Sequence, residues 1–199
     1  MNPSKSPSFV NDQYFILNKK GVSDSLNKIE RIVKEVHAIN EPFEKVWIQE
    51  DQIKGSIYKI DSTTFEKVNA CYLNEFKSII EKETGLQDLE LVAVRRNLLC
   101  KNEYVEMHKD VEGYVVIIDI PEPINPEEDG NENNNYHYNN DKRTFEGGNI
   151  LFTKDDGEIV EIALKPDELF VAKCTNNHGV RKVLSGERES IALFSRPNI

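Results

Sequence analysis

The chain has 199 residues, of which 38% are hydrophobic and 9% aromatic, with a net charge of −10 and a pI of about 5.0. This length suits one domain with a substantial core and leaves little room for two. The acidic balance disfavours a nucleic-acid or anionic membrane partner, because like charges repel each other. No apolar run approaches the ~20 residues that span a bilayer.

The cysteine pattern and the first residues bear on the compartment. Cys71, Cys100 and Cys174 are odd in number and form no CxxC pair. Such usage favours free thiols in a reducing compartment over a disulfide framework. Residues 1–12 are polar and lack the apolar segment of a secretory signal. We therefore expect a soluble cytoplasmic protein with a flexible N-terminal tail over 1–12.

The first half of the chain predicts one strand and two helices. The run YFIL at 14–17 reads as an edge strand. From Ser23, apolar residues recur at spacings of three and four, which predicts an amphipathic helix. Its apolar positions are Leu26, Ile29, Val33 and Val36.

A second helix is signalled by its ends as well as its period. The sequence TTFE at 63–66 predicts a capping box, and Gly85 stands where a C-terminal cap is expected. The apolar positions between them are Phe65, Val68, Tyr72, Phe76 and Ile79. We expect residues 23–85 to form a helical support.

After Gly85 the pattern changes to short strands separated by turn residues. The expected strands are LELVAVRRNLL (89–99), YVVIIDI (114–120), NILFT (149–153), EIVEIAL (158–164), ELFVAK (168–173) and SIALFS (190–195). The sequence DDG at 155–157 predicts a hairpin turn. Strands without helical crossovers indicate an antiparallel sandwich or barrel with the N-terminal helices outside.

Residues 122–146 interrupt this series of strands. The segment is rich in Asn, Pro and acidic residues and has no apolar period, which predicts an inserted loop. We see no repeat and no second domain, so residues 13–199 are expected to form a single domain with its barrel over 89–197.

A candidate metal site lies in the sequence EMHKD. His108 and Asp110 are two residues apart, and side chains at that spacing share one face of a strand. His178 follows an apolar strand at a turn and is the candidate for a third ligand. His37 and His137 read as solvated residues, on a helix surface and in the loop. Two histidines and one carboxylate are the ligand set of non-haem Fe(II) oxygenases.

A cation and a hydroxyl follow the third candidate ligand. Arg188 lies ten residues after His178, and Ser190 lies two residues further, on the same strand face. A guanidinium in this position can hold a carboxylate in bidentate fashion, with the hydroxyl as a second donor.

These motifs, in this order, resemble the 2-oxoglutarate/Fe(II)-dependent dioxygenase superfamily, most closely its compact prolyl-hydroxylase-like branch. The resemblance covers roughly residues 90–197. It rests on HxD (108–110), GG (147–148), His178 and RES (188–190), with NEYVEMHKD, EGGNILF and KPDELFVAKCTNNHGVRKV around them. Asn102 departs from the pattern, because a glycine is common there in that branch.

The resemblance implies a double-stranded β-helix, a jelly-roll or cupin-like barrel that holds the metal in its mouth. It implies His108, Asp110 and His178 as Fe(II) ligands, with O2 and 2-oxoglutarate as co-substrates. Arg188 would bind the distal carboxylate of 2-oxoglutarate, with Ser190 assisting and Tyr104 as a further candidate. The implied activity is that of a 2-oxoglutarate-dependent dioxygenase, a hydroxylase that releases succinate and CO2. A carboxylate at Asp110 favours hydroxylation over halogenation.

The substrate stays open at this point. It is an amino acid, a small metabolite or a protein side chain, and the oligomeric state is not indicated. The loop over 122–146 is either a lid, with Tyr136, Tyr138, Lys142 and Arg143 as contacts, or a solvated insertion. The alternative function is a non-catalytic, cupin-like metal-binding or interaction protein. Such a protein would need the ligands but no clamp for a co-substrate.

Overall fold

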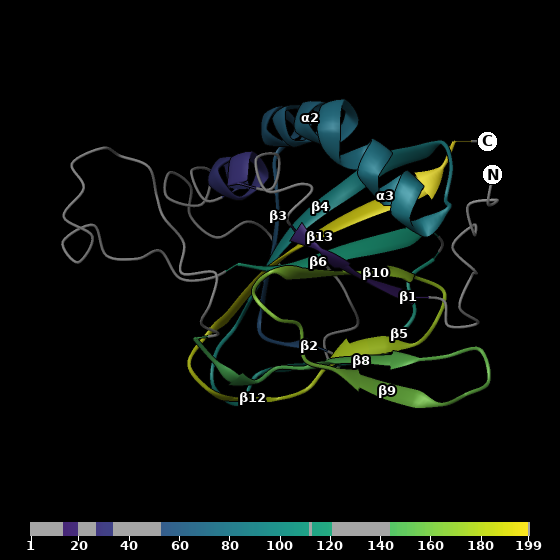
Figure 1. Cartoon of the computed structure of the whole chain (residues 1–199). Helices are drawn as coiled ribbons and strands as arrows, with labels where there is room; N and C mark the ends of the chain where they lie inside the picture. The colour runs from purple at the N-terminus through teal and green to yellow at the C-terminus, as the bar shows by residue number, and fades with distance from the viewer. Residues whose placement is uncertain (1–13, 20–26, 34–52, 112, 121–143, 199) are drawn as a thin grey trace.

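The structure is a computed structural model that describes residues 14–19, 27–33, 53–111, 113–120 and 144–198. The expected tail over 1–12 and residues 122–143 of the expected loop lie outside this description. Three layers are visible: helices lie above a larger sheet, and a smaller sheet lies below it (Figure 1). Within the described part of the chain, no helix has the length and apolar character needed to cross a bilayer.

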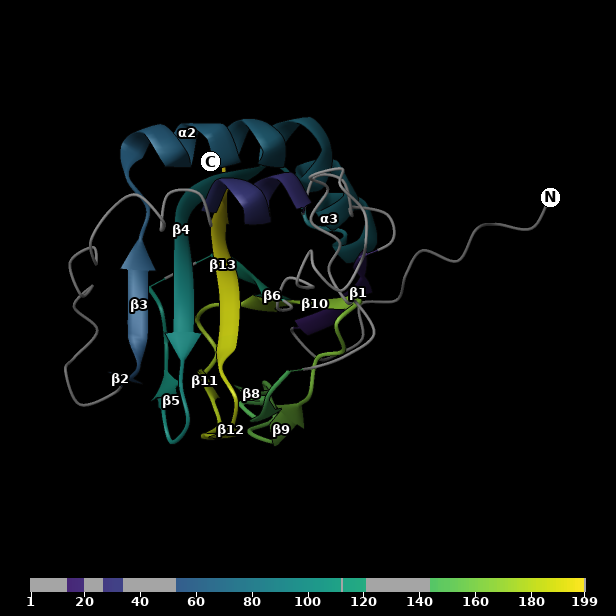
Figure 2. The same ribbon diagram turned by 90° about the vertical axis from the view of Figure 1, so that its left-hand side faces the viewer.

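The larger sheet has six strands in the order β1-β10-β6-β13-β4-β3, and all its pairings are antiparallel. Its strands are β1 (Tyr14–Asn18), β3 (Ser56–Lys59), β4 (Leu89–Leu99), β6 (Tyr114–Ile120), β10 (Glu168–Lys173) and β13 (Arg188–Pro197). Figure 2 shows β3, β4 and β13 side by side beneath the helices. The predicted edge strand is confirmed, since β1 forms one edge of this sheet.

The smaller sheet has five strands in the order β2-β5-β11-β8-β9, also antiparallel. Its strands are β2 (Ile53–Lys54), β5 (Tyr104–His108), β8 (Ile150–Thr153), β9 (Ile159–Ile162) and β11 (His178–Val180). A short additional pair joins β7 (Glu146–Gly147) to β12 (Val183–Ser185). The turn DDG connects β8 to β9 as a hairpin, as predicted. The antiparallel two-sheet architecture agrees with the expected sandwich or barrel.

The central strands of the larger sheet are buried on both faces. In β6, Val116 and Ile118 belong to the core cluster beneath the helices, whereas Val115 and Ile117 belong to clusters on the opposite face. A strand covered on both sides has no polar face, which is why YVVIIDI reads as an almost unbroken apolar run. The alternation of strand side chains puts Asp119 on the face of Val115 and Ile117, toward the smaller sheet.

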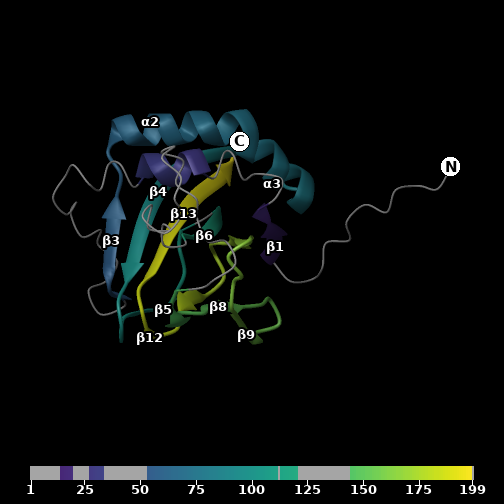
Figure 3. The same cartoon turned by 60° about the vertical axis from the view of Figure 1, so that its left-hand side comes forward.

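The helical layer consists of α2 (Ser62–Cys71), a π-helical turn (Tyr72–Phe76) and α3 (Lys77–Thr84). Figure 3 shows α2 and α3 along the top of the larger sheet. The expected capping box is wrong, because the N-cap is Asp61, whose carboxylate accepts a 2.8 Å hydrogen bond from the Thr64 N–H. The expected C-cap is confirmed: Gly85 adopts a left-handed conformation with φ of 74°.

The π-helical turn changes which residues face the core. Val68, Tyr72 and Phe76 are buried as the helical period predicts, but the next buried apolar residue is Ile80, and Ile79 is only partly buried. A π turn inserts one residue into the helical period, so the inward face moves by one position.

The first predicted helix is described only in part. Residues 27–33 are helical, and Ile29 and Val33 are buried in the core cluster beneath the helices, as expected. The other two expected apolar positions, Leu26 and Val36, lie outside the described residues.

We predict that Phe76→Ala lowers the free energy of unfolding by about 3–5 kcal/mol, because it leaves a cavity in a fully buried site. Leu73→Ala is the matched control, since Leu73 lies in the same π turn but is half exposed. Urea denaturation of both variants measures the difference. Equal losses would mean that the π turn does not face the core as described.

Candidate active site

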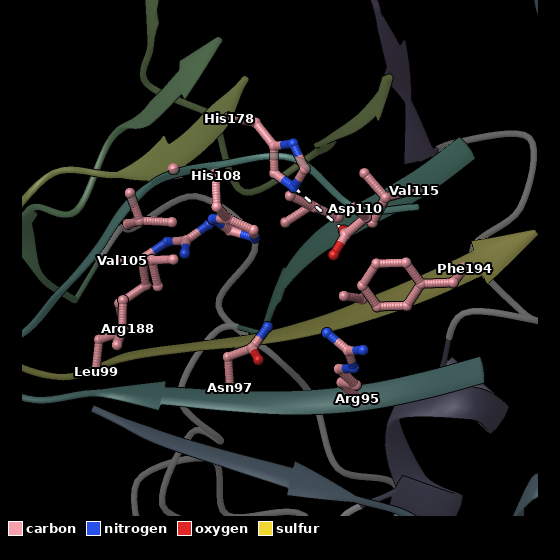
Figure 4. A pocket seen from close by; sticks show the side chains of 14 residues that line it. Arg95, Asn97, Leu99, Val105, His108, Asp110, Val115, His178, Arg188 and Phe194 are labelled. Carbon is pink, nitrogen blue, oxygen red and sulfur yellow. Dashed lines mark ion pairs between the residues drawn. The ribbon is translucent and has the colours of Figure 1, made fainter. Parts of the chain in front are cut away.

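A pocket lies between the two sheets, where the ends of β5 and β11 approach the inner face of the larger sheet. Its walls are mainly apolar side chains from β4, β5, β6, β11 and β13. The polar and charged side chains that line it are Arg95, Asn97, His108, Asp110, His178 and Arg188. Figure 4 shows these side chains converging from the strands into one space.

Three of the lining residues form a potential metal-binding group. His108 ends β5, His178 begins β11, and the pairing of these two strands sets the two histidines directly opposite each other. Asp110 lies beyond the end of β5, not on the strand as the spacing suggested, and its backbone N–H donates to the Cys174 carbonyl. One donor atom from each of the three residues lies within 4.8 Å of the others.

Each imidazole is oriented by a backbone carbonyl. The Nδ1 atom of His108 lies 2.9 Å from the Glu106 carbonyl oxygen, and Nδ1 of His178 lies 2.9 Å from the Asn176 carbonyl oxygen. A carbonyl can only accept, so both Nδ1 atoms carry the proton. In the neutral imidazoles, Nε2 then carries the lone pair that can bind a cation, as in metal-binding histidines. Nε2 of His178 lies 3.4 Å from Oδ2 of Asp110 (Figure 4), so a bound cation would take the place of the proton that a charged His178 shares with this carboxylate.

The protonation of the group also suits a cation. Burial lowers the pKa of His108, and the positive charge of His178 lowers it further. Burial raises the pKa of Asp110, but the hydrogen bond and charge of His178 and the charge of His108 outweigh it and leave this pKa below its usual value. A neutral imidazole beside an ionised carboxylate is the form that coordinates divalent metals.

The Arg188 side chain lies at one end of the pocket. It is 2% exposed, and its NH2 atom lies 2.6 Å from Oδ1 of Asp119 on the neighbouring strand β6. The two groups are close but poorly oriented for hydrogen bonding. Among the described residues, Nε and NH2 of Arg188 and both carboxylate oxygens of Asp119 have no hydrogen-bond partner. Buried donors of this kind are normally satisfied, so a buried and unsatisfied guanidinium facing a pocket fits an anionic ligand.

Neither Ser190 nor Tyr104 is among the residues that line the pocket. Ser190 is buried on the same face of β13 as Arg188 but is not among the lining residues, and the Asn97 amide approaches its hydroxyl at 3.5 Å. A bulge in β5 between His108 and Val105 turns Val105 into the pocket, and Tyr104 does not line it. The expectation for Tyr104 assumed an unbroken strand.

The GG motif contacts the arginine end of the pocket. Gly148 has φ of +60°, and a Cβ atom at this position would lie 2.9 Å from Cδ of Arg188. Glycine is therefore needed both for the left-handed backbone and for the space that Arg188 occupies.

Sequence reasoning missed two lining residues, Arg95 and Asn97, and the partner of Arg188, Asp119. Asp119 gave one local signal, as the single charge inside the apolar run YVVIIDI. Arg95 lines the pocket with its guanidinium 4.6 Å from the centre of the Phe194 ring. Asn97 is two residues away, on the same strand face. His37, His137 and the four candidate loop contacts lie outside the described residues.

Comparison with known proteins gives a result only at the level of structure. No protein-family model matches the sequence, and no curated protein matches it. A 2OG-Fe(II) oxygenase family oxidoreductase from Burkholderia pseudomallei aligns with a TM-score of 0.67 and 15% identity, over 92% of this chain and 85% of that chain. A prolyl-4-hydroxylase from Pseudomonas putida aligns with a TM-score of 0.59 and 15% identity, over 94% of each chain. SnoN, a non-heme alpha-ketoglutarate-dependent epimerase from nogalamycin biosynthesis, aligns with a TM-score of 0.64 and 10% identity, over 94% of this chain and 77% of that chain.

The chain therefore has the double-stranded β-helix fold of the 2-oxoglutarate/Fe(II) oxygenases. The expected fold class is confirmed, and the resemblance that the motifs indicated is borne out at the level of the fold. At such low identity the alignment establishes the fold, so activity has to be argued from the site.

We predict that His178→Ala weakens Mn(II) binding by more than about 100-fold, since even residues that only support a ligand contribute about 10–100-fold. Asp156→Asn is the control, because it neutralises an exposed carboxylate in the β8–β9 turn. Titration with Mn(II), followed by electron paramagnetic resonance, measures both. Unchanged affinity in His178→Ala would place the metal elsewhere.

We predict that Gly148→Ala destabilises the protein by more than Gly157→Ala does. Both glycines have a left-handed φ, so each substitution strains the backbone by about 1–3 kcal/mol. Only a Cβ at 148 meets Arg188, whereas a Cβ at 157 meets nothing within 4 Å. Chemical denaturation measures the free energy of unfolding of both variants. Equal losses of stability would show that the Arg188 side chain moves aside at no cost.

Proposed function

We propose that the protein is an oxygenase that depends on Fe(II), 2-oxoglutarate and O2. The observation that carries the proposal is the combination, in one pocket, of two histidines and a carboxylate with a buried arginine. Neither the metal-binding group nor the buried arginine would identify this function by itself. Together they supply a place for a metal and a place for the far end of a dicarboxylic acid.

His108, Asp110 and His178 would hold the iron. Two imidazoles and one carboxylate are the facial set of non-haem Fe(II) oxygenases, which leaves coordination positions open. The described donor atoms are close enough to share one ion, and in the neutral imidazoles Nε2 can supply a lone pair to it. When bound, Fe(II) with 2-oxoglutarate and O2 supplies an oxidant for a substrate C–H bond, while 2-oxoglutarate is converted to succinate and CO2.

The side chains around the triad orient the co-substrate. The Arg188 guanidinium would bind its distal carboxylate, with Nε and NH2 as donors. Asn97, which lines the pocket, and Ser190, whose hydroxyl it approaches, would support this end. The apolar walls limit the access of water to the reacting groups, which strengthens each charged contact inside.

The reaction proposed is hydroxylation of an amino acid, a small metabolite or a protein side chain. Asp110 supports hydroxylation over halogenation, because its carboxylate occupies the position that a halide would need. The aligned structures include a hydroxylase and an epimerase, so the fold alone does not choose between outcomes.

The setting proposed is a single cytoplasmic domain over residues 13–199. All three cysteines are free thiols. Burial raises the pKa of Cys174 to about 12, which makes this thiol a poor nucleophile. Unpaired thiols are stable in a reducing compartment.

The alternative is a non-catalytic, cupin-like protein that binds a metal through the same three residues. The Arg188–Asp119 pair favours it, because the arginine already has an anionic neighbour. Anaerobic addition of Fe(II) and 2-oxoglutarate separates the two functions. Chelation of the keto acid by ferrous iron gives a weak visible charge-transfer band, and no substrate needs to be known. Iron binding without this band supports the alternative.

We predict that Arg188→Gln weakens 2-oxoglutarate binding by about 30-fold or more and leaves Mn(II) binding unchanged, because a buried carboxylate would lose its charged partner. Arg181→Gln is the matched control, since Arg181 pairs with Glu161 on the surface. Calorimetric titration of the Mn(II)-loaded variants measures both affinities. Equal affinities for 2-oxoglutarate would remove Arg188 from the proposed site.

A further inference from the structure

The Asp119 carboxylate does not itself line the pocket, but it contacts the guanidinium of Arg188, which does, and the proposed reaction does not use it. It lies on β6 directly opposite Ser190 of β13, on the face that looks toward the smaller sheet. Its side chain is 9% exposed, and Oδ1 is 2.6 Å from NH2 of Arg188. Neither of its oxygens has a well-aligned hydrogen-bond donor among the described residues. It therefore competes for the same guanidinium that would bind a ligand.

Lys19 is a further positive charge that interacts with Asp119, but it does not line the pocket. Leu99, Val105 and Val180 form the apolar wall at this end of the pocket. Arg95, the other arginine that lines the pocket, packs on Phe194 at the far side of the triad (Figure 4). Lys19 donates its hydrogen bond to the backbone carbonyl of Asp119.

A dicarboxylic acid that reaches Arg188 therefore brings a second carboxylate next to Asp119. Two anions would share one guanidinium inside a mainly apolar pocket, where like charges repel strongly. A 2-oxo acid with an uncharged far end places no second anion there. The Arg188–Asp119 pair thus discriminates between 2-oxo acids by the charge at the end distal to the keto group. It does not act on the keto-acid end, which a metal would hold.

We propose that Asp119 is a specificity-determining residue of the co-substrate site, which penalises the distal carboxylate of 2-oxoglutarate. This inference rests on the proposed function, since it concerns binding of a 2-oxo acid at the same site. In the native protein Asp119 offsets part of the affinity that Arg188 gives to the distal carboxylate, so 2-oxopentanoate, which carries a methyl group there, still competes with 2-oxoglutarate. Neutralising Asp119 releases Arg188 for the dicarboxylate.

The test is calorimetric titration of Mn(II)-loaded protein with 2-oxoglutarate and with 2-oxopentanoate. Asp119→Asn is expected to tighten 2-oxoglutarate binding by at least about tenfold, because the like-charge contact is removed. Binding of 2-oxopentanoate should stay within about twofold, since its methyl group does not sense that charge. Glu189→Gln is the matched control: it removes a carboxylate of β13 that pairs with Arg96 of β4 at 2.7 Å, and neither residue lines the pocket. It should leave both affinities unchanged.

Each outcome is decisive. If Asp119→Asn leaves the ratio of the two affinities unchanged, or weakens 2-oxoglutarate, then Asp119 positions Arg188 and the inference is overturned while the proposed function stands. If neither acid binds any of these proteins, the proposed function fails, and the inference fails with it. Should Asp119→Asn not fold, Arg188→Gln is compared with the double variant Arg188→Gln/Asp119→Asn. The double variant should bind 2-oxoglutarate more tightly, and an equal or weaker affinity would overturn the inference.

Discussion

The candidate site depends on the register between two short strands of the smaller sheet. The pairing of β5 with β11 sets His178 opposite His108, and β11 is held on its other side by β8. A slip of one residue would turn one imidazole away from the pocket, because strand side chains alternate between faces. The geometry of the group is thus fixed by sheet hydrogen bonds and not by the helices, which cover the opposite face of the larger sheet.

The arginine end of the pocket is held by a different kind of interaction. Removing two charges from water costs more than their attraction returns, unless hydrogen bonds satisfy both groups. Arg188 and Asp119 are close, but their hydrogen-bond geometry is poor. The pair is therefore weak evidence for stability. Unsatisfied buried polar groups in an otherwise well-packed sheet are more readily explained by a binding role.

The sequence predicted strands and ligands well where the signal is local. The bounds of β4, β6 and β10 agree with the expected runs, because strands with continuous apolar sequence are bounded by clear turn residues. The sequence did not predict two one-residue irregularities, the π turn before Ile80 and the bulge in β5 that turns Tyr104 away. Neither of them changes the amino-acid composition of its segment. The role of Asp119 could not be predicted either, because it depends on contact with Arg188. These two residues meet through the pairing of strands far apart in the chain.

The close approach of Gly148 to Arg188 ties two positions that are forty residues apart in sequence. A larger residue at 148 can be accommodated only if the side chain at 188 becomes shorter or leaves its place. Evolution of this chain is therefore constrained to change the two positions together. Among related sequences, a loss of glycine at 148 should mark lineages that have abandoned arginine at 188, and with it the recognition of an anionic ligand.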